Sequence, residues 1–202
     1  SLNVRENGRR LVPEEWTMKR FIIGWLMCGL SGWVGGEMKE GVEMDTAVFA
    51  AGCFWGVESV FQEIGGVVDT TVGYTGGRSE NPTYKEICYK NTGHAEAIEI
   101  VYDPARVTYE KLLELFWRMH DPTTMNRQGP DVGTQYRSAV FYYSPEQKAA
   151  AEQLKVESQG RWKQPIVTEI VAGGTFYPAE DYHQNYFKNR GINHHGCHYI
   201  RD

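Results

Sequence analysis

The sequence predicts an α/β fold of the α+β kind, a two-layer sandwich in which helices cover one face of a mostly antiparallel sheet. Short apolar runs alternate with helical patterns, and glycines and prolines separate them. Hydrophobic residues make up 41% and charged residues 23% of the 202 residues. This composition excludes a disordered or fibrous chain and is sufficient for one core. The net charge of −5 excludes a nucleic-acid binder that acts through a basic surface.

The first half of the predicted core contains three strands and one helix. A short apolar run at 46–51 ends at a glycine and is typical of a buried strand. After it, apolar residues recur at helical spacing until the glycine pair at 65–66, which ends the helix. Turn residues bound the next two apolar runs, so we expect strands at 67–74 and 95–102.

The second half adds a helix and a strand and completes the core. Thr108 is suited to cap the helix that follows it, and a fourth strand is expected at 138–143. The run Ser144-Pro145-Glu146-Gln147 begins another helix, with serine at the cap and proline in the first turn. We also expect an added strand at 166–171 and a short helix at 178–187. The core order β-α-β-β-α-β is the split βαβ arrangement of ferredoxin-like folds.

The two ends of the chain differ from the main domain, which we place at 45–190. Residues 1–44 form an N-terminal extension, and 191–202 form a mobile tail. Within the extension, 18–36 combine a Met-Lys-Arg start with an uncharged apolar run, and this pattern resembles a secretory signal peptide. The run is short for a membrane span, which needs roughly 20 residues. A translated upstream extension has the same pattern, so both a cytoplasmic location and export to the cell envelope stay open.

The four widely spaced cysteines exclude a disulfide scaffold and a zinc-finger pattern. Cys53 lies where the first predicted strand leads into the first helix, between two glycines and directly before Phe54 and Trp55. Unpaired backbone N–H groups and the helix dipole at such a position favour the thiolate over the thiol. Cys53 is therefore a candidate nucleophile. For Cys28 and Cys88 we expect the commoner role of a buried structural cysteine.

Several short motifs around this cysteine belong together. They are Gly52-Cys53-Phe54-Trp55-Gly56, Val72-Gly73-Tyr74-Thr75-Gly76-Gly77, Asn81-Pro82-Thr83-Tyr84, Thr92-Gly93-His94-Ala95-Glu96-Ala97, Asp131-Val132-Gly133-Thr134-Gln135-Tyr136-Arg137-Ser138 and Ala179-Glu180-Asp181-Tyr182-His183-Gln184. In order and approximate spacing, this set resembles the class A peptide methionine sulfoxide reductases. The resemblance covers about 46–186.

The resemblance implies an enzyme that reduces the S epimer of methionine sulfoxide, free or in proteins, and so repairs proteins under oxidative stress. By resemblance, Cys53 attacks the sulfoxide sulfur and becomes a sulfenic acid. Glu96 protonates or hydrogen-bonds the departing oxygen, and Tyr84 and Tyr136 are neighbouring hydrogen-bond donors.

The resemblance also implies how the substrate is held and how the cysteine is reset. Phe54 and Trp55 hold the methyl group of the substrate, and Asp131 orients its backbone. Cys197 in the tail resolves the sulfenic acid as a disulfide, which thioredoxin then reduces. Cys88 is not expected to take this role. No cofactor, metal or nucleic acid is implied, and we expect a monomer.

The pattern around Glu96 agrees with an acid role. A proton donor must still be protonated near neutral pH, so its pKa has to be raised. Strand alternation places Glu96 on the same face as Ile98 and Ile100. If that face packs on the helices, burial disfavours the charged carboxylate. Glu99 lies on the opposite face and is expected to be an ordinary carboxylate.

Three other interpretations stay open. A methionine-binding module without chemistry would not need the thiol of Cys53. Cysteine-dependent acyl transfer would pair Cys53 with His94 or His183 as the base, although for His94 we favour a structural hydrogen-bonding role. A copper or zinc site in the tail would use the ligand cluster His194, His195, Cys197 and His198.

Overall fold

The computed structural model describes residues 5–6, 9–10, 43–193, 195–196, 198 and 200–201. The signal-like segment at 18–36, and with it Cys28, lies outside the described residues, as do His194 and Cys197. In the part of the chain that is described, helices fall short of the length and apolar character that a bilayer crossing requires.

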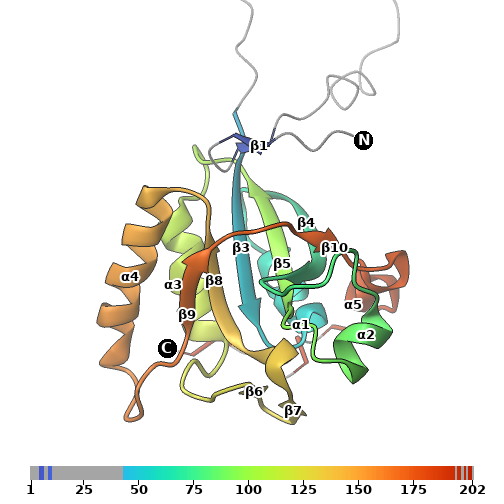
Figure 1. The fold of residues 1–202 in the computed structure, drawn as a ribbon. Coiled ribbons are helices and arrows are strands. Elements are labelled where there is room, and N and C mark those ends of the chain that lie inside the picture. The colour runs from blue at the N-terminus through green and yellow to red at the C-terminus, as the bar shows by residue number, and fades with distance from the viewer. Residues whose placement is uncertain are drawn as a thin grey trace, which may run out of the picture.

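One mixed sheet forms the centre of the molecule (Figure 1). Four strands make its core, in the spatial order β8-β3-β5-β4, and each neighbouring pair is antiparallel. Their bounds are Asp45–Ala51 for β3, Val67–Thr75 for β4, Ala95–Tyr102 for β5 and Ser138–Tyr142 for β8. This order is that of a split βαβ core and confirms the predicted fold class.

Shorter strands extend this core at its margins. Next to β8 lies the parallel strand β9, Glu169–Ala172, and next to β4 the antiparallel strand β10, Tyr177–Pro178. Near the N-terminus, β1 (Arg5–Glu6) pairs with β2 (Arg9–Arg10), and Arg9 of β2 pairs with Asp45 of β3. A separate two-stranded ladder joins β6, Arg127–Gln128, to β7, Asp131–Val132.

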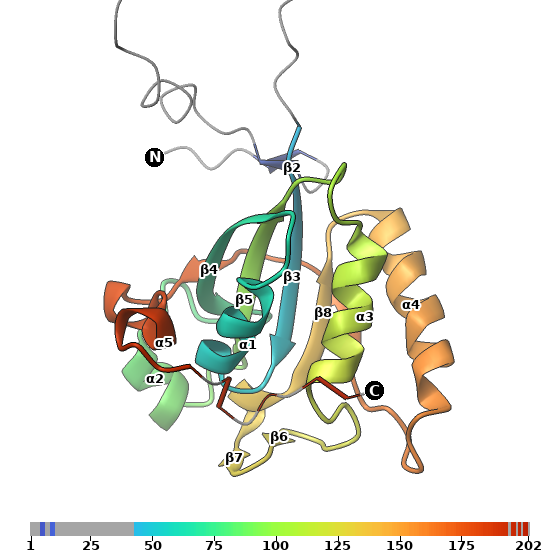
Figure 2. The ribbon, with the colours of Figure 1, turned by 180° about the vertical axis from the view of Figure 1, so that it is seen from behind.

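The longer helices lie on one face of the sheet (Figure 2). They are α1 (Phe54–Phe61), α3 (Tyr109–Met119) and α4 (Pro145–Gln159). Apolar side chains of these helices and of β3 and β5 form the main core. On the opposite face, the segment between β9 and β10 crosses the strands (Figure 1) and contributes Phe176 to a smaller apolar cluster. The two layers match the predicted sandwich.

β5 illustrates how the sequence pattern becomes a buried strand. Ile98 and Ile100 pack into the main core beneath the helices, as the alternation predicts. Ala95 and Ala97 belong to the smaller cluster on the other face. Glu99, which was expected to be an ordinary carboxylate, is instead buried, with an exposed fraction of 3%. β5 has a neighbouring strand on both sides, and side chains cover both of its faces.

The predicted helix starts agree with the structure. The side chain of Thr108 accepts a hydrogen bond from the backbone N–H of Lys111, and Ser144 caps α4 in the same way through the N–H of Gln147. Capping satisfies N–H groups that have no partner within the helix.

Two expected elements have different bounds. The strand expected at 166–171 begins only at Glu169. Before it, the backbone N–H of Ile166 donates a hydrogen bond to the Gln159 side chain and not to a neighbouring strand. The helix expected at 178–187 is divided into a 3₁₀ turn, η4 (Asp181–His183), and a short helix, α5 (Tyr186–Asn189). Between them, Asn185 has a left-handed backbone with φ of 53°, which interrupts the helix.

Two short helical elements were not predicted. They are α2, Tyr84–Tyr89, and the 3₁₀ turn η3, Thr134–Tyr136. A capping box begins α2. The Thr83 side chain accepts a hydrogen bond from the backbone N–H of Glu86, and the Glu86 carboxylate accepts one from the backbone N–H of Thr83. The sequence Thr-x-x-Glu is the signature of this box and could have indicated the helix.

Candidate active site

The candidate nucleophile lies at the junction that the sequence predicts. β3 ends at Ala51, Gly52 turns the chain with φ of 94°, and Cys53 is the N-cap residue of α1. A side chain at Gly52 would be strained by this left-handed backbone and would also contact Gln128. Cys53 is half-buried, at the positive end of the helix dipole.

Glu96 occupies the space beside this cysteine. Its Oε2 accepts a hydrogen bond of 3.1 Å from the backbone N–H of Phe54, the residue directly after Cys53. Only 2% of Glu96 is exposed. Burial raises the pKa of its carboxyl from 4.5 to about 8, aided by the charge of Asp131 and opposed by the Phe54 N–H. Glu96 is therefore largely protonated at neutral pH and can donate a proton there.

Tyr136 and Asp131 lie around the same carboxyl. Burial raises the pKa of the Tyr136 hydroxyl, and the charges of Glu96, Asp131 and Cys53 raise it further. Tyr136 is therefore within electrostatic range of all three groups. Burial also raises the pKa of Asp131. The loop that contains β7 and η3 brings both residues to Glu96.

Tyr84 is the first residue of α2. Burial raises the pKa of its hydroxyl, and a hydrogen bond with the Cys88 thiol adds to the effect, as does the charge of Glu96. Cys88 itself is half-buried, and burial raises the pKa of its thiol. This sulfur therefore has less thiolate character than an ordinary cysteine.

The two aromatic residues after Cys53 have different environments. Phe54 is 1% exposed and packs in an apolar cluster with Tyr74. Trp55 is only partly buried. Its indole stacks on the Tyr186 ring at a centroid distance of 3.7 Å and donates a hydrogen bond of 3.0 Å to His183 Nδ1. Trp55 is thus the aromatic of the pair with surface available to a ligand.

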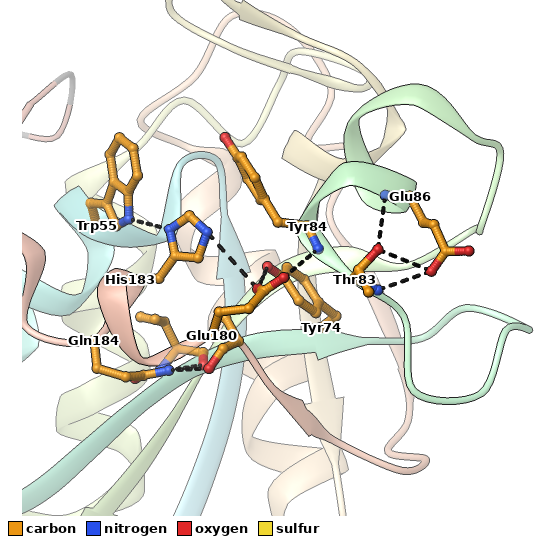
Figure 3. A network of polar contacts seen from close by, with 10 residues as sticks. Trp55, Tyr74, Thr83, Tyr84, Glu86, Glu180, His183 and Gln184 are labelled. Atoms are coloured by element: carbon orange, nitrogen blue, oxygen red, sulfur yellow. Dashed lines mark hydrogen bonds and ion pairs between the residues drawn. The ribbon is translucent and has the colours of Figure 1, made fainter.

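A polar network that the sequence analysis did not assign supports this region (Figure 3). The carboxylate of Glu180 accepts one hydrogen bond from the backbone N–H of Tyr84 and another from the hydroxyl of Tyr74. His183 joins it to Trp55. Glu180 and His183 both lie in the motif at 179–184, which was the available signal, but the motif alone does not reveal these partners.

The histidines proposed for acyl transfer have other partners. His94 accepts a bond from the Gly77 N–H at Nδ1 and lies 2.8 Å from the Ser79 carbonyl at Nε2. Both ring nitrogens of His94 are thus occupied, in the structural role that we favoured. His183 uses Nδ1 for Trp55. Nε2 of His183 lies 4.0 Å from Glu180 Oε2 and has no hydrogen-bond partner among the described residues.

Part of the C-terminal segment packs on the start of α1. His198 is 3% exposed, and its Nε2 donates a hydrogen bond of 2.6 Å to the Ala51 carbonyl. A side chain at Gly56 would overlap the His195 carbonyl and the His198 ring. The His195 carbonyl and the His198 ring therefore lie close to the residues that flank Cys53.

The same contacts bear on the metal hypothesis for the tail. The rings of His195 and His198 are hydrogen-bonded to Ser59 and to the Ala51 carbonyl, respectively. Among the described residues, there is no group of three or more metal-ligating side chains. His194 and Cys197 lie outside those residues.

Known proteins are similar to this chain over most of its length. The profile of the family described as peptide methionine sulfoxide reductase matches residues 45–201. The peptide methionine sulfoxide reductase MsrA of Methanosarcina acetivorans is 57% identical over 156 residues, which cover 76% of this chain and 83% of the relative.

Solved structures are similar as well. Reduced Mxr1 from Saccharomyces cerevisiae superposes with a TM-score of 0.74 at 36% identity, covering 79% of this chain and 93% of Mxr1. Mxr1 in complex with Trx2 gives a TM-score of 0.55 at 29% identity, covering 79% and 91%.

Proposed function

The chain belongs to the peptide methionine sulfoxide reductase family, and from this premise we propose how its residues reduce methionine-S-sulfoxide to methionine, free or in proteins. The observation that carries the proposal is the 3.1 Å hydrogen bond between Glu96 and the Phe54 N–H. It holds a carboxyl that is largely protonated at neutral pH next to the candidate nucleophile.

In the first step, the sulfur of Cys53 attacks the sulfoxide sulfur. Glu96 protonates the sulfoxide oxygen, which makes the oxygen easier to transfer. The bond formed between the two sulfur atoms and the sulfur–oxygen bond of the substrate then break as the protonated oxygen passes to Cys53, which becomes a sulfenic acid. The substrate leaves as methionine, reduced by two electrons. Tyr84 and Tyr136 donate hydrogen bonds to the oxygen during this transfer.

Substrate selection rests on shape and on one charge. The partly exposed indole of Trp55, with Phe54 packed behind it, holds the small methyl group of the sulfoxide. Asp131 orients the backbone of the substrate. A pocket that places the methyl group and the oxygen on fixed sides accepts one epimer of the chiral sulfur and rejects the other.

In the second step, the thiol of Cys197 attacks the sulfenic acid of Cys53, a disulfide forms and water leaves. Support for this role comes from Gly56, where a side chain would overlap residues 195 and 198, the near neighbours of Cys197 in the sequence. Thioredoxin then reduces the disulfide. The solved complex of Mxr1 with Trx2 supports thioredoxin as the reductant, and no further cofactor is needed.

The proposal is tested with separated S and R epimers of a methionine sulfoxide peptide, followed by counting thiols after one turnover. We expect reduction of the S epimer alone and the loss of two thiols. The variant C53S should lose all reductase activity. C28S is the matched control and should lose the same two thiols as the unmodified chain. Reduction by C53S would overturn the assignment of the nucleophile.

The resolving cysteine is tested separately. We expect C197S to complete about one turnover per enzyme and then stop when thioredoxin is the reductant, while a small dithiol restores activity. Repeated turnover of C197S with thioredoxin would contradict the role of Cys197 and leave the role of Cys53 intact.

A further inference from the structure

Glu180 connects two sides of the candidate site. It lies between β10 and η4, and the oxygens of its carboxylate have different partners (Figure 3). Oε1 accepts a hydrogen bond of 2.9 Å from the backbone N–H of Tyr84. Oε2 accepts one of 3.0 Å from the hydroxyl of the buried Tyr74 and lies 4.0 Å from His183 Nε2.

The first branch fixes the start of α2. The first N–H groups of a helix have no partner within it. The capping box supplies a partner for the N–H of Glu86, whereas the N–H of Tyr84 bonds to Glu180. Because Tyr84 is the first residue of α2, this bond sets the position from which its side chain extends toward Glu96.

The second branch leads through His183 to Trp55. Nδ1 of His183 accepts a hydrogen bond from the indole N–H of Trp55. In the neutral ring, the proton is therefore on Nε2, which faces Glu180. Burial lowers the pKa of His183, which favours this neutral form. At 4.0 Å and without a hydrogen bond to Nε2 in the described residues, the Glu180 carboxylate favours this tautomer through its negative charge alone.

We propose that Glu180 is a positioning residue that fixes the placement of Tyr84 relative to Trp55, on opposite sides of the reacting sulfoxide. This inference rests on the proposed function, which assigns these two residues to the oxygen and the methyl group. The carboxylate is charged: burial opposes ionisation, but the bonds from Tyr84 and Tyr74 hold the pKa of Glu180 below its usual value.

The test is the variant E180Q, which has nearly the same size but only one acceptor oxygen. Its amide nitrogen cannot accept either the Tyr84 N–H or the Tyr74 O–H. We expect kcat/KM for the S epimer to fall about 10-fold to 100-fold, with KM rising through Trp55 and kcat falling through Tyr84. The variant E180D keeps both acceptors and should regain part of the loss.

A double-mutant cycle with Y84F separates positioning from general destabilisation. If Glu180 acts by placing the Tyr84 hydroxyl, E180Q lowers kcat much less in the Y84F background than in the unmodified chain. An equal fold-loss of kcat in both backgrounds would overturn the proposal. E86Q is the matched control, because the Glu86 carboxylate also binds the start of α2 but has its hydrogen bonds with Thr83 and Lys90.

A spectroscopic measurement keeps this test independent of the reaction. In amide-proton spectra, with the Trp55 indole signal assigned through W55F, we expect E180Q to shift that signal and to speed exchange of the Tyr84 amide. E86Q should leave the indole signal in place. If the indole signal and the Tyr84 amide were unchanged in E180Q, the inference would be wrong even if the chain reduced methionine sulfoxide. If both changed although the unmodified chain had no reductase activity, the positioning role would hold and the proposed function would fail.

Discussion

Glu96 meets two opposing influences at the start of α1. The N–H of Phe54 and the helix dipole favour its charged form, whereas burial among aromatic residues favours the neutral form. Burial dominates, because the pKa rises to about 8 despite the bond from Phe54. In the proposed mechanism, the N–H of Phe54 holds the Glu96 carboxyl in place before proton transfer and stabilises the carboxylate after it.

At the scale of this residue, we expect the rate of the first step to depend on the protonated form of Glu96. In single turnovers followed by methionine release, the rate should fall as the pH rises through about 8, because the acid is then lost. E96Q cannot donate a proton in this way, so its rate should be roughly 100-fold lower at pH 7 and should not fall further near pH 8.

E152Q is the control for this measurement. Glu152 lies on the exposed side of α4 and pairs only loosely with Lys148 at 3.7 Å. The variant should keep the rate and the pH profile of the unmodified chain. If E96Q kept a rate within about threefold of that chain, Glu96 would not be the acid.

At the scale of elements, α1 and the C-terminal segment meet at Gly56. Replacing a helical glycine by alanine normally favours the helix by up to about 1 kcal/mol. In G56A, the added methyl group overlaps the His195 carbonyl and the His198 ring, so the segment has to move away from α1. We expect slower disulfide formation after the first turnover, measured as the loss of the second thiol, while the first step stays near its usual rate.

The matched variant is G65A. Gly65 follows α1, and a side chain there would contact nothing within 4 Å. Its disulfide should form at the rate of the unmodified chain. Equal rates for G56A and G65A would show that the packing of the tail on Gly56 does not influence the resolving step.

Local sequence patterns were sufficient to predict the main helices and strands, but not the long-range hydrogen bonds that hold them in place. The strand at 95–102 and the caps at Thr108 and Ser144 follow from periodicity and capping chemistry, and the structure confirms them. The helix expected at 178–187 is divided because Gln184 bonds to the backbone of Val72 in β4, and the left-handed Asn185 follows it. A contact between residues this far apart in the sequence leaves no periodic signal.

The site shows the same division. Cys53 could be assigned from its position at a strand–helix junction, and the buried face of Glu96 from strand alternation. The partners of Glu180 could not, since Tyr84 lies 96 residues away in the sequence. Similarly, alternation placed Glu99 on the opposite face but could not show that this face is also covered.

At the scale of the whole molecule, two sets of buried titratable groups have opposite effects on stability. The pKa of Glu58 is raised by burial to about 7 and that of Glu96 to about 8, both from 4.5. Above pH 4.5, these two carboxyls therefore bind more protons in the folded chain than in the unfolded chain. The free energy of unfolding contributed by these carboxyls decreases as the pH rises, until each folded pKa is passed.

Three buried histidines act in the other direction. Burial lowers the pKa of His120 from 6.5 to about 3, and it also lowers the pKa of His183 and His198. Below pH 6.5, the unfolded chain binds more protons at these rings than the folded chain does. Their contribution to the free energy of unfolding therefore increases as the pH rises toward 6.5 and is constant above it.

Above pH 6.5 the two carboxyls dominate, because the histidines are then largely neutral in both states, whereas Glu58 and Glu96 still lose their protons in the folded chain. Each net proton changes the free energy of unfolding by about 1.4 kcal/mol per pH unit, so we expect a loss on the order of 2 kcal/mol between pH 6.5 and 8.5. Urea unfolding at pH 5.5, 6.5 and 8.5 measures it. In E58Q, the loss of unfolding free energy above pH 6.5 should be smaller. A steady increase in the stability of the unmodified chain up to pH 8.5 would show that Glu58 and Glu96 are already charged in the folded protein.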